Sequence, residues 1–229
     1  MHESSKTNAI RTPAFFAAYL SGSVLDIGCG PDPVVPRARP FDRAHGDAGR
    51  ITAYLSETFD TVYSSHCLEH MPDVPQALAG WWQLVKPGGH LIVVVPHEDL
   101  YEQGFWPSLY NRDHKATFRL DTERSWSPRS YDLRRLVARL PGAEIVAAGV
   151  QDHGYTYAWL PAIGARPRIL GVLRRFVSRL RHSILKRARR RDAAARWLNP
   201  LMARWGIPTD QTLQGALAQI ECVARKRAH

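Results

Sequence analysis

A short apolar run that ends in an acid and two closely spaced glycines constrains this chain more than any other segment. Residues 24–33 read VLDIGCGPDP. The run from Val24 to Gly28 predicts a buried parallel strand, because it is short, apolar and stops at a glycine turn. Glycines let such a turn bring its backbone close to a bound nucleotide. The segment therefore predicts a strand followed by a nucleotide-binding loop.

The residues after this turn leave little room for helices. Four prolines fall within residues 31–40, which excludes the usual crossover helix there. Residues 39–42 predict a short second strand that ends in Asp42, sixteen residues after Asp26. This spacing is close to the one at which dinucleotide-binding folds place a ribose-binding acid. Only four residues then separate Asp42 from Asp47, so we expect abbreviated helices on the cofactor side.

The rest of the chain alternates strands with amphipathic helices, which is typical of a doubly wound α/β sheet. Apolar runs predict strands over residues 59–64, 90–95, 143–150 and 218–224. Helical spacing predicts a helix over 74–85, ended by the KPGG sequence at 86–89, and another opened by Ser127 and Pro128. Trp81 and Trp82 are expected to be packing residues. We expect an α/β fold with a Rossmann-like, doubly wound sheet of about seven strands.

Three segments in this order resemble the class I S-adenosylmethionine-dependent methyltransferases. They are the glycine turn, the sequence FDTVYSSHCLEH at 59–70 and the sequence LVKPGGHLIVVVP at 84–96. The resemblance covers residues 23–96 and, more loosely, 219–226. The fragments SSHCLEH, VPHEDLY and NRDHK are similar to a subgroup found among bacterial polysaccharide and natural-product genes.

The resemblance implies S-adenosyl-L-methionine as the cofactor and assigns residues to its parts. Gly28, Cys29 and Gly30 form the turn under the methionine moiety, and Asp26 holds that turn and the amino group, directly or through water. Asp42 accepts hydrogen bonds from both ribose hydroxyls.

For the adenine, the resemblance implies Asp47 as acceptor and the backbone amide of Ala48 as donor. It places Ser65 and His66 beside the sulfonium. The family usually has a third small residue where this chain has Asp32, so no contact is assigned to Asp32.

Methyl transfer to a hydroxyl needs an aligned acceptor and a base to take its proton. Two candidates follow the expected fifth strand. One is His97, directly after that strand, and the other is His114, which Asp113 or a nearby acid would orient. Neither cluster has an HxxxH or paired-carboxylate spacing, so the sequence predicts no metal site. The aromatic residues around these clusters suit either stacking on a sugar or a packed lid.

The net charge of +10 is concentrated in one segment. Residues 166–191 contain eleven Lys or Arg and no acid, so the rest of the chain carries −1. In this segment an apolar stripe (Ile169, Val172, Leu173, Phe176, Val177, Leu180 and Ile184) lies opposite basic residues (Arg174, Arg175, Arg179, Arg181 and Lys186) at helical spacing. Such a helix either docks on an anionic membrane surface or packs on the domain with solvated arginines. Nucleic-acid binding is not expected, because no basic platform interleaved with aromatics is present.

Length and composition predict one methyltransferase domain over residues 1–229. Its parts are a cofactor-binding half (23–96), an acceptor-site excursion (97–127), a basic helical insertion (154–208) and a closing strand (217–226). The polar start of the chain and the absence of a long apolar run predict a cytoplasmic protein, either free or peripheral at the inner membrane face. The three cysteines are expected to be reduced thiols, and the oligomeric state stays open.

Three functions are compatible with these patterns. The leading one is O-methylation of a sugar, a glycan or a glycolipid-linked hydroxyl by in-line transfer with a His general base. The second is a small-molecule or N-methyltransferase of a natural-product pathway. The third is a non-catalytic scaffold that binds the cofactor.

Overall fold

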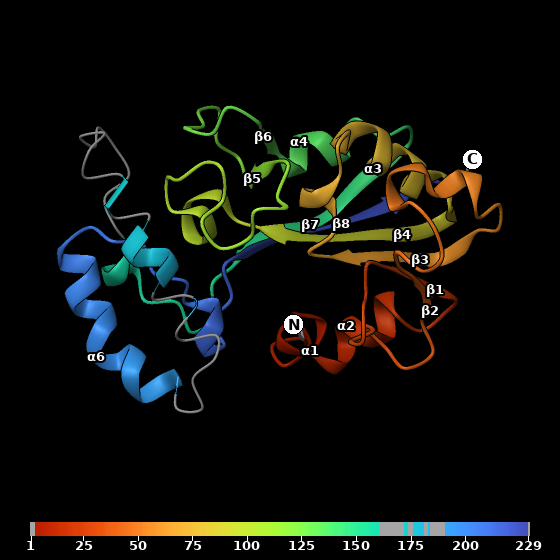
Figure 1. Cartoon of the computed structure of the whole chain (residues 1–229). Helices are drawn as coiled ribbons and strands as arrows, with labels where there is room; N and C mark the ends of the chain where they lie inside the picture. The colour runs from red at the N-terminus through yellow and green to blue at the C-terminus, as the bar shows by residue number, and fades with distance from the viewer. Residues whose placement is uncertain (1–2, 161–171, 174–175, 181–182, 184–190, 229) are drawn as a thin grey trace.

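The chain folds around a six-stranded sheet with the strand order β2-β1-β3-β4-β8-β7 (Figure 1). The computed structural model describes residues 3–160, 172–173, 176–180, 183 and 191–228. The strands are β1 (Val24–Ile27), β2 (Arg39–Phe41), β3 (Phe59–Ser65), β4 (Val85–Pro96), β7 (Ala143–Gln151) and β8 (Gln219–Lys226). The first four are parallel, and β8 runs antiparallel to β4 and β7.

Helices cover both faces of the sheet (Figure 1). Helices α3 (Val74–Gln83) and α4 (Leu133–Ala138) lie on one face, and α1 (Glu3–Asn8) and α2 (Pro13–Tyr19) lie on the other. Alternating residues of β4 divide between two apolar clusters, because side chains along a strand point to opposite faces. The doubly wound α/β fold expected from the sequence is therefore confirmed.

Trp81 and Trp82 of α3 are packing residues, as expected. Both are buried, and each indole N–H donates a hydrogen bond, Trp81 to the carbonyl of Ala48 and Trp82 to the carbonyl of Pro141. The first bond ties α3 to the 3₁₀ helix η1 (Ala48–Ala53). That helix stands at the cofactor side of the sheet.

The cofactor-side connections are abbreviated, which confirms the expectation from the prolines. Residues 28–38 join β1 to β2 without a helix, and only η1 lies between β2 and β3. A hydrogen bond to β1 holds the proline-rich connection in place. The backbone amide of Val34 donates it to the buried carboxylate of Asp26 at 2.6 Å.

Three local expectations need correction. The main sheet has six strands instead of about seven, and a separate two-stranded sheet pairs β5 (Thr117–Arg119) with β6 (Ser130–Asp132). Helix α3 ends at Gln83, and the KPGG residues already belong to β4, where Gly88 has a φ of 80°. Ser127 and Pro128 do not open a helix. Helix α4 begins after Asp132, whose carboxylate caps it by accepting from the amide of Arg135.

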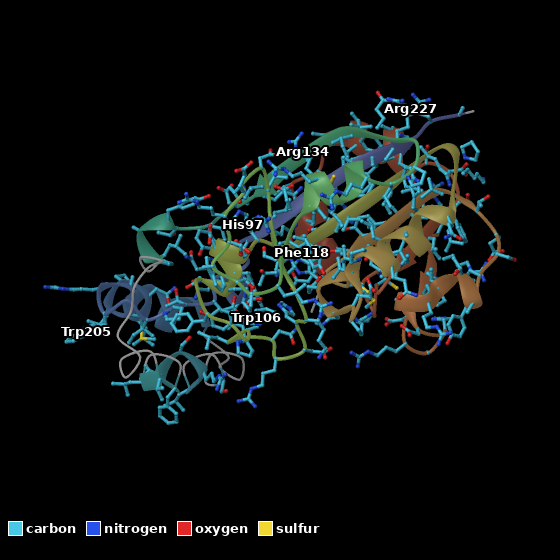
Figure 2. All side chains as sticks on the ribbon, turned by 90° about the horizontal axis from the view of Figure 1, so that it is seen from above. His97, Trp106, Phe118, Arg134, Trp205 and Arg227 are labelled. Atoms are coloured by element: carbon cyan, nitrogen blue, oxygen red, sulfur yellow. The ribbon has the colours of Figure 1, made fainter. Side chains whose placement is uncertain are left out.

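A helical region precedes the closing strand, as expected, and includes α6 (Arg191–Arg204). It lies at one end of the molecule, so that Trp205 and Arg227 are far apart in Figure 2. Part of the predicted basic helix lies outside the described residues, including Ile169, Ile184, Arg174, Arg175, Arg181 and Lys186. Within the described ranges, no helix is long and apolar enough to cross a membrane.

Candidate active site

The turn after β1 fits closely against the segment that follows β3. Gly28 has a φ of 78°, and a Cβ at this position would lie 2.7 Å from Cβ and Sγ of Cys67. Gly30 also has a positive φ, of 54°. Only glycine meets both demands at Gly28, the left-handed backbone and the missing side chain. The two loops at the carboxyl ends of β1 and β3 therefore share one narrow region.

Acidic side chains hold this turn in shape. Oδ2 of Asp42 accepts a 2.7 Å hydrogen bond from the amide of Gly30, which fixes the acid at the end of β2 over the glycine turn. Asp26 lies fully buried beneath the turn. Burial, together with the charges of Asp32 and Asp42, raises the pKa of Asp26 to about 7. The hydrogen bond from Val34 lowers this pKa, but by less than burial raises it. Asp26 is not among the cavity-lining residues, so its place in the structure is that of a brace for the loop.

Two adjoining cavities open beside the turn, with volumes of about 290 and 270 Å³. Gly28, Asp42, His66 and His70 line both of them. The smaller cavity is also lined by Asp47 and Ala48, and the larger one by Cys29, Gly30 and Ser65. Except for Asp26, all the residues expected to bind the cofactor thus line these two adjoining cavities.

Asp47 and Ala48 are placed by the start of η1. Oδ1 of Asp47 accepts from the amide of Gly49 at 2.8 Å and caps this helix. Cys29 stays a thiol at neutral pH, since burial and the nearby Asp26 raise its pKa to about 11.

The N-terminal helix α1 also borders the larger cavity. Glu3 and Ser4 line it, and the amide of Ser5 donates to the carboxylate of Asp32 at 2.9 Å. Asn8 donates to the carbonyl of Val34 at 2.8 Å. Asp32, to which the sequence assigned no contact, therefore anchors α1 over the glycine turn. Sequence reasoning missed this role because the polar start of the chain carries no motif.

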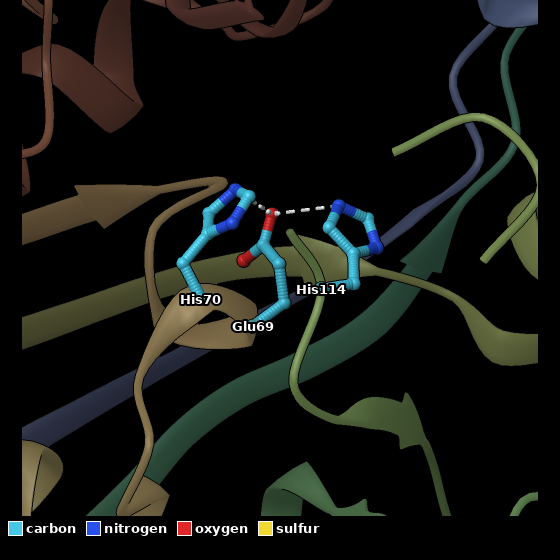
Figure 3. Close-up of side chains that lie close together, drawn as sticks. All are labelled: Glu69, His70 and His114. Carbon is cyan, nitrogen blue, oxygen red and sulfur yellow. Dashed lines mark ion pairs between the residues drawn. The ribbon is translucent and has the colours of Figure 1, made fainter. Parts of the chain in front are cut away.

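Three histidines lie near Glu69, which follows β3. Figure 3 shows two of them, His70 and His114, on either side of its carboxylate. His66 Nδ1, His70 Nε2 and His114 Nε2 lie 3.6, 3.8 and 3.9 Å from Oε1 of Glu69. Burial opposes ionisation of Glu69, but His66, His114 and His70 outweigh it and lower the pKa of this carboxyl. Contact with Glu69 in turn raises the pKa of His66 in spite of its burial. The cluster lines the larger cavity.

The acid beside His114 is Glu102 and not Asp113. His114 Nδ1 lies 2.6 Å from Oε1 of Glu102, and both side chains are almost fully buried. Asp113 instead lies 3.2 Å from Nδ1 of His70. Sequence reasoning did not include Glu69, His70 or Glu102 among the site residues. The sequence did not indicate this cluster, because Glu102 and His114 are far from Glu69 along the chain. The fold brings the segment that carries them back to the end of β3.

His97, the other candidate base, lies away from this arrangement. Its side chain caps the short helical turn η3 (Glu98–Glu102), where Nδ1 accepts from the amide of Asp99 at 3.1 Å. It does not line either cavity. Burial lowers its pKa in spite of neighbouring acids. The structure thus brings His114, but not His97, to the cavity of the glycine turn.

Comparison with known proteins agrees with this arrangement. A family model described as a methyltransferase domain matches residues 3–140, which is more than half of the chain. Trans-aconitate 2-methyltransferase of Deinococcus radiodurans is 48% identical over 42 residues, and this match spans only 16% of that protein's length and 18% of this chain.

Solved structures of similar shape include the YcgJ protein of Bacillus subtilis (16% identity, TM-score 0.49, all of both chains). Another is an S-adenosylmethionine-dependent methyltransferase of Archaeoglobus fulgidus (13% identity, TM-score 0.49, 99% of this chain and 95% of that one).

The extent of the family match shows that the chain belongs to the methyltransferase-domain family. It is an S-adenosylmethionine-dependent methyltransferase, and its glycine turn, Asp42 and the adjoining cavities fit that cofactor.

The buried Asp26 predicts a specific pH dependence of stability. The folded state keeps this proton up to about pH 7, whereas an unfolded Asp loses it near pH 3.9. Between these values the unfolded chain binds fewer protons, so stability falls as pH rises. Asp26→Asn keeps an acceptor for the amide of Val34 but cannot ionise. In this variant the fall in the free energy of unfolding with rising pH, on the order of 3–4 kcal/mol in the wild type, should be absent.

Chemical denaturation of the cofactor-free protein from pH 4 to pH 8 measures this effect. Glu144→Gln, at an exposed position on β7, is the matched control and should keep the wild-type profile. An Asp26→Asn profile parallel to that of the wild type would contradict the assigned burial cost.

Proposed function

We propose that the protein methylates a hydroxyl of a small polyhydroxy acceptor, such as a sugar or a glycolipid-linked glycan. The supporting observation is that the half-buried His66 and His70 and the buried His114 and Glu69 line the same cavity as the glycine turn. Ser4, Asn111 and Thr212 add further polar side chains to the lining of this cavity. A hydroxyl needs such groups to orient it and to remove its proton.

The reaction is an in-line displacement that balances with one proton released. The acceptor oxygen forms a bond to the methyl carbon, and the carbon–sulfur bond breaks with its electron pair going to sulfur. The acceptor proton leaves to the histidine cluster, with His114 as its central member. Glu102 supports this role, because its carboxylate accepts from Nδ1 and turns Nε2 of His114 toward the cavity.

An amine acceptor is the second candidate. Glu69 places a buried carboxylate in the cavity wall, and neither of its oxygens receives a hydrogen bond from the described residues. A protonated amine would supply that donor. In this case the enzyme would be a small-molecule N-methyltransferase.

For the cofactor we assign the ribose to Asp42, the adenine to Asp47 and Ala48, and the methionine end to Gly28, Cys29 and Gly30. Ser65 and His66 then lie beside the sulfur, and Asp26 acts through the loop. The carboxylate of Asp42 supports this assignment because it stands at the end of β2 and borders both cavities.

Removal of the Asp42 carboxylate should weaken cofactor binding. We expect Asp42→Ala to lose on the order of 1–3 kcal/mol, or about 5–150-fold in Kd, because two ribose hydroxyls lose their acceptor. Calorimetric titration with S-adenosylhomocysteine measures this. Glu144→Ala should bind like the wild type, and an unchanged Kd in Asp42→Ala would refute the assignment.

A strain without the gene serves both to identify the acceptor and to test the role of the histidine cluster. A strain without the gene should accumulate a product lighter by one methyl group, which untargeted mass spectrometry detects. His114→Ala should fail to restore the methylated product, with turnover on the identified acceptor roughly 10²–10⁴-fold lower and S-adenosylhomocysteine affinity retained.

His153→Ala, a change of an exposed histidine, should restore the product fully. Loss in His97→Ala together with near-normal activity in His114→Ala would move the role to His97. A methyl group found on nitrogen would favour the second candidate.

We propose in addition that the basic segment docks the enzyme on anionic membrane surfaces. Four side chains of its apolar stripe, Val172, Leu173, Phe176 and Leu180, are 70, 59, 65 and 51% exposed, whereas Val177 is half-buried. The eleven basic residues of 166–191 supply the charge complementarity. Each basic residue near the surface contributes about 1 kcal/mol, screened over about 8–10 Å at physiological salt.

Vesicle co-sedimentation tests this docking. The wild type should sediment with anionic vesicles at low salt and less at high salt. Replacement of Arg174, Arg175, Arg179 and Arg181 by Glu should abolish sedimentation and leave cofactor binding intact. The same exchange at the exposed Arg124, Arg139, Arg225 and Arg227 is the charge-matched control. A wild type that stays in solution even at low salt would show that the segment has another role.

A further inference from the structure

Glu69 occupies an unusual position for a carboxylate. It belongs to the short 3₁₀ turn η2 (Leu68–His70) after β3 and is 1% exposed. Among the described residues, no donor forms a hydrogen bond to either of its oxygens. A buried carboxylate without donors is costly, unless a cation lies beside it.

Two imidazole nitrogens approach the same oxygen from different sides (Figure 3). Nε2 of His70 and Nε2 of His114 lie 3.8 and 3.9 Å from Oε1 of Glu69, beyond hydrogen-bond distance. The three ligand atoms are all within 4.8 Å of one another. Zinc binds such atoms at about 2.0–2.2 Å, which places two ligands of a tetrahedral ion about 3.4 Å apart. A small inward movement therefore completes a three-ligand site.

The outer nitrogens of both rings are held by carboxylates. Nδ1 of His114 lies 2.6 Å from Glu102, and Nδ1 of His70 lies 3.2 Å from Asp113. When these acids accept the Nδ1 proton, each Nε2 presents a lone pair to Glu69, which is also an acceptor. These three acceptors face one another, and Nδ1 of His66 lies 3.6 Å from the same Glu69 oxygen on a further side. A cation held between the three would satisfy all of them at once. Carboxylates on the far nitrogen are also the usual outer partners of metal-binding histidines.

We propose that Glu69, His70 and His114 bind one divalent transition-metal ion of the zinc class, with the remaining coordination position open to the cavity. Imidazole ligands favour zinc and its neighbours over magnesium and calcium. Methyl transfer is not a redox reaction, so a redox-inert ion suffices. Two histidines and one carboxylate with an open position are the donor set of catalytic zinc. The sequence predicted no metal, because Glu69 and His114 are 45 residues apart.

This inference rests on the proposed function and deepens it. An ion beside the cofactor cavity would bind the acceptor hydroxyl and lower its pKa, so that the oxygen attacks as a better nucleophile. His114 would then act as a ligand, and the acceptor proton would pass to His66, which lines the same cavity and is not one of the three ligands. Loss of His114 would impair turnover through the ion.

Metal binding to the full chain, with no acceptor present, tests the site. The protein is stripped with a chelator and titrated separately with Zn²⁺, Co²⁺ and Mg²⁺ by calorimetry, and bound metal is counted by elemental analysis. We expect one Zn²⁺ per chain, competition by Co²⁺ with a visible absorption band of low-coordinate cobalt, and no comparable binding of Mg²⁺.

Matched variants locate the ion. Glu69→Gln and His70→Asn should each abolish stoichiometric Zn²⁺ binding, and Glu102→Gln should weaken it about 10–100-fold. His153→Ala, far from the cluster in the sequence and exposed, should bind like the wild type. Circular dichroism verifies folding, and the two ligand variants serve as alternatives if one of them does not fold.

Two results would overturn the metal site. One is a wild type that binds neither Zn²⁺ nor Co²⁺ stoichiometrically, and the other is undiminished binding in both folded ligand variants. Failure of the metal site is distinguishable from failure of the proposed function. If no metal binds but His114→Ala still loses turnover with cofactor affinity retained, the hydroxyl methyltransferase stands and His114 takes the proton directly.

Discussion

The close approach of Gly28 to Cys67 is the constraint on which the rest of the site depends. A side chain at Gly28 would meet Cys67 at 2.7 Å, so the glycine turn and the segment after β3 can share one cavity only while this position has no Cβ. The turn brings Asp42 over the cofactor side, and the segment after Cys67 carries Glu69 and His70. The contact between these two strand ends thus places the cofactor-binding turn next to Glu69 and His70.

The two halves of the cavity are closed from different parts of the chain. Helix α1 is anchored through Ser5 on Asp32 and borders the cavity on one side. The excursion after β4 returns with Glu102 and His114 on the other. Both closures depend on polar contacts to buried acids, which are directional and strong where water is excluded. The sheet therefore supplies the glycine turn and the strand ends of the site. Helix α1 and the segment after β4 supply the rest of the cavity wall.

The parts predictable from the sequence were those with a local pattern. Apolar runs located the strands of the main sheet, and the prolines of 31–40 correctly excluded a crossover helix. The glycines and Asp42 were expected on the cavity that they line. The helix expected from Ser127 and Pro128 was wrong, because Asp132 stands directly before the apolar face of α4 and caps it better. Glu102 beside His114, and α1 over the turn, depend on contacts between distant segments, which no local pattern reveals.

The central claim is that the cofactor's sulfur faces the Glu69 cluster across one continuous cavity. A crystal structure with S-adenosylhomocysteine tests it directly. The account predicts the ribose at Asp42, the adenine beside Asp47, and the sulfur turned toward Glu69, His70 and His114. A complex in which the sulfur points away from the cluster, or in which the homocysteine tail fills the space between His70 and His114, would contradict it.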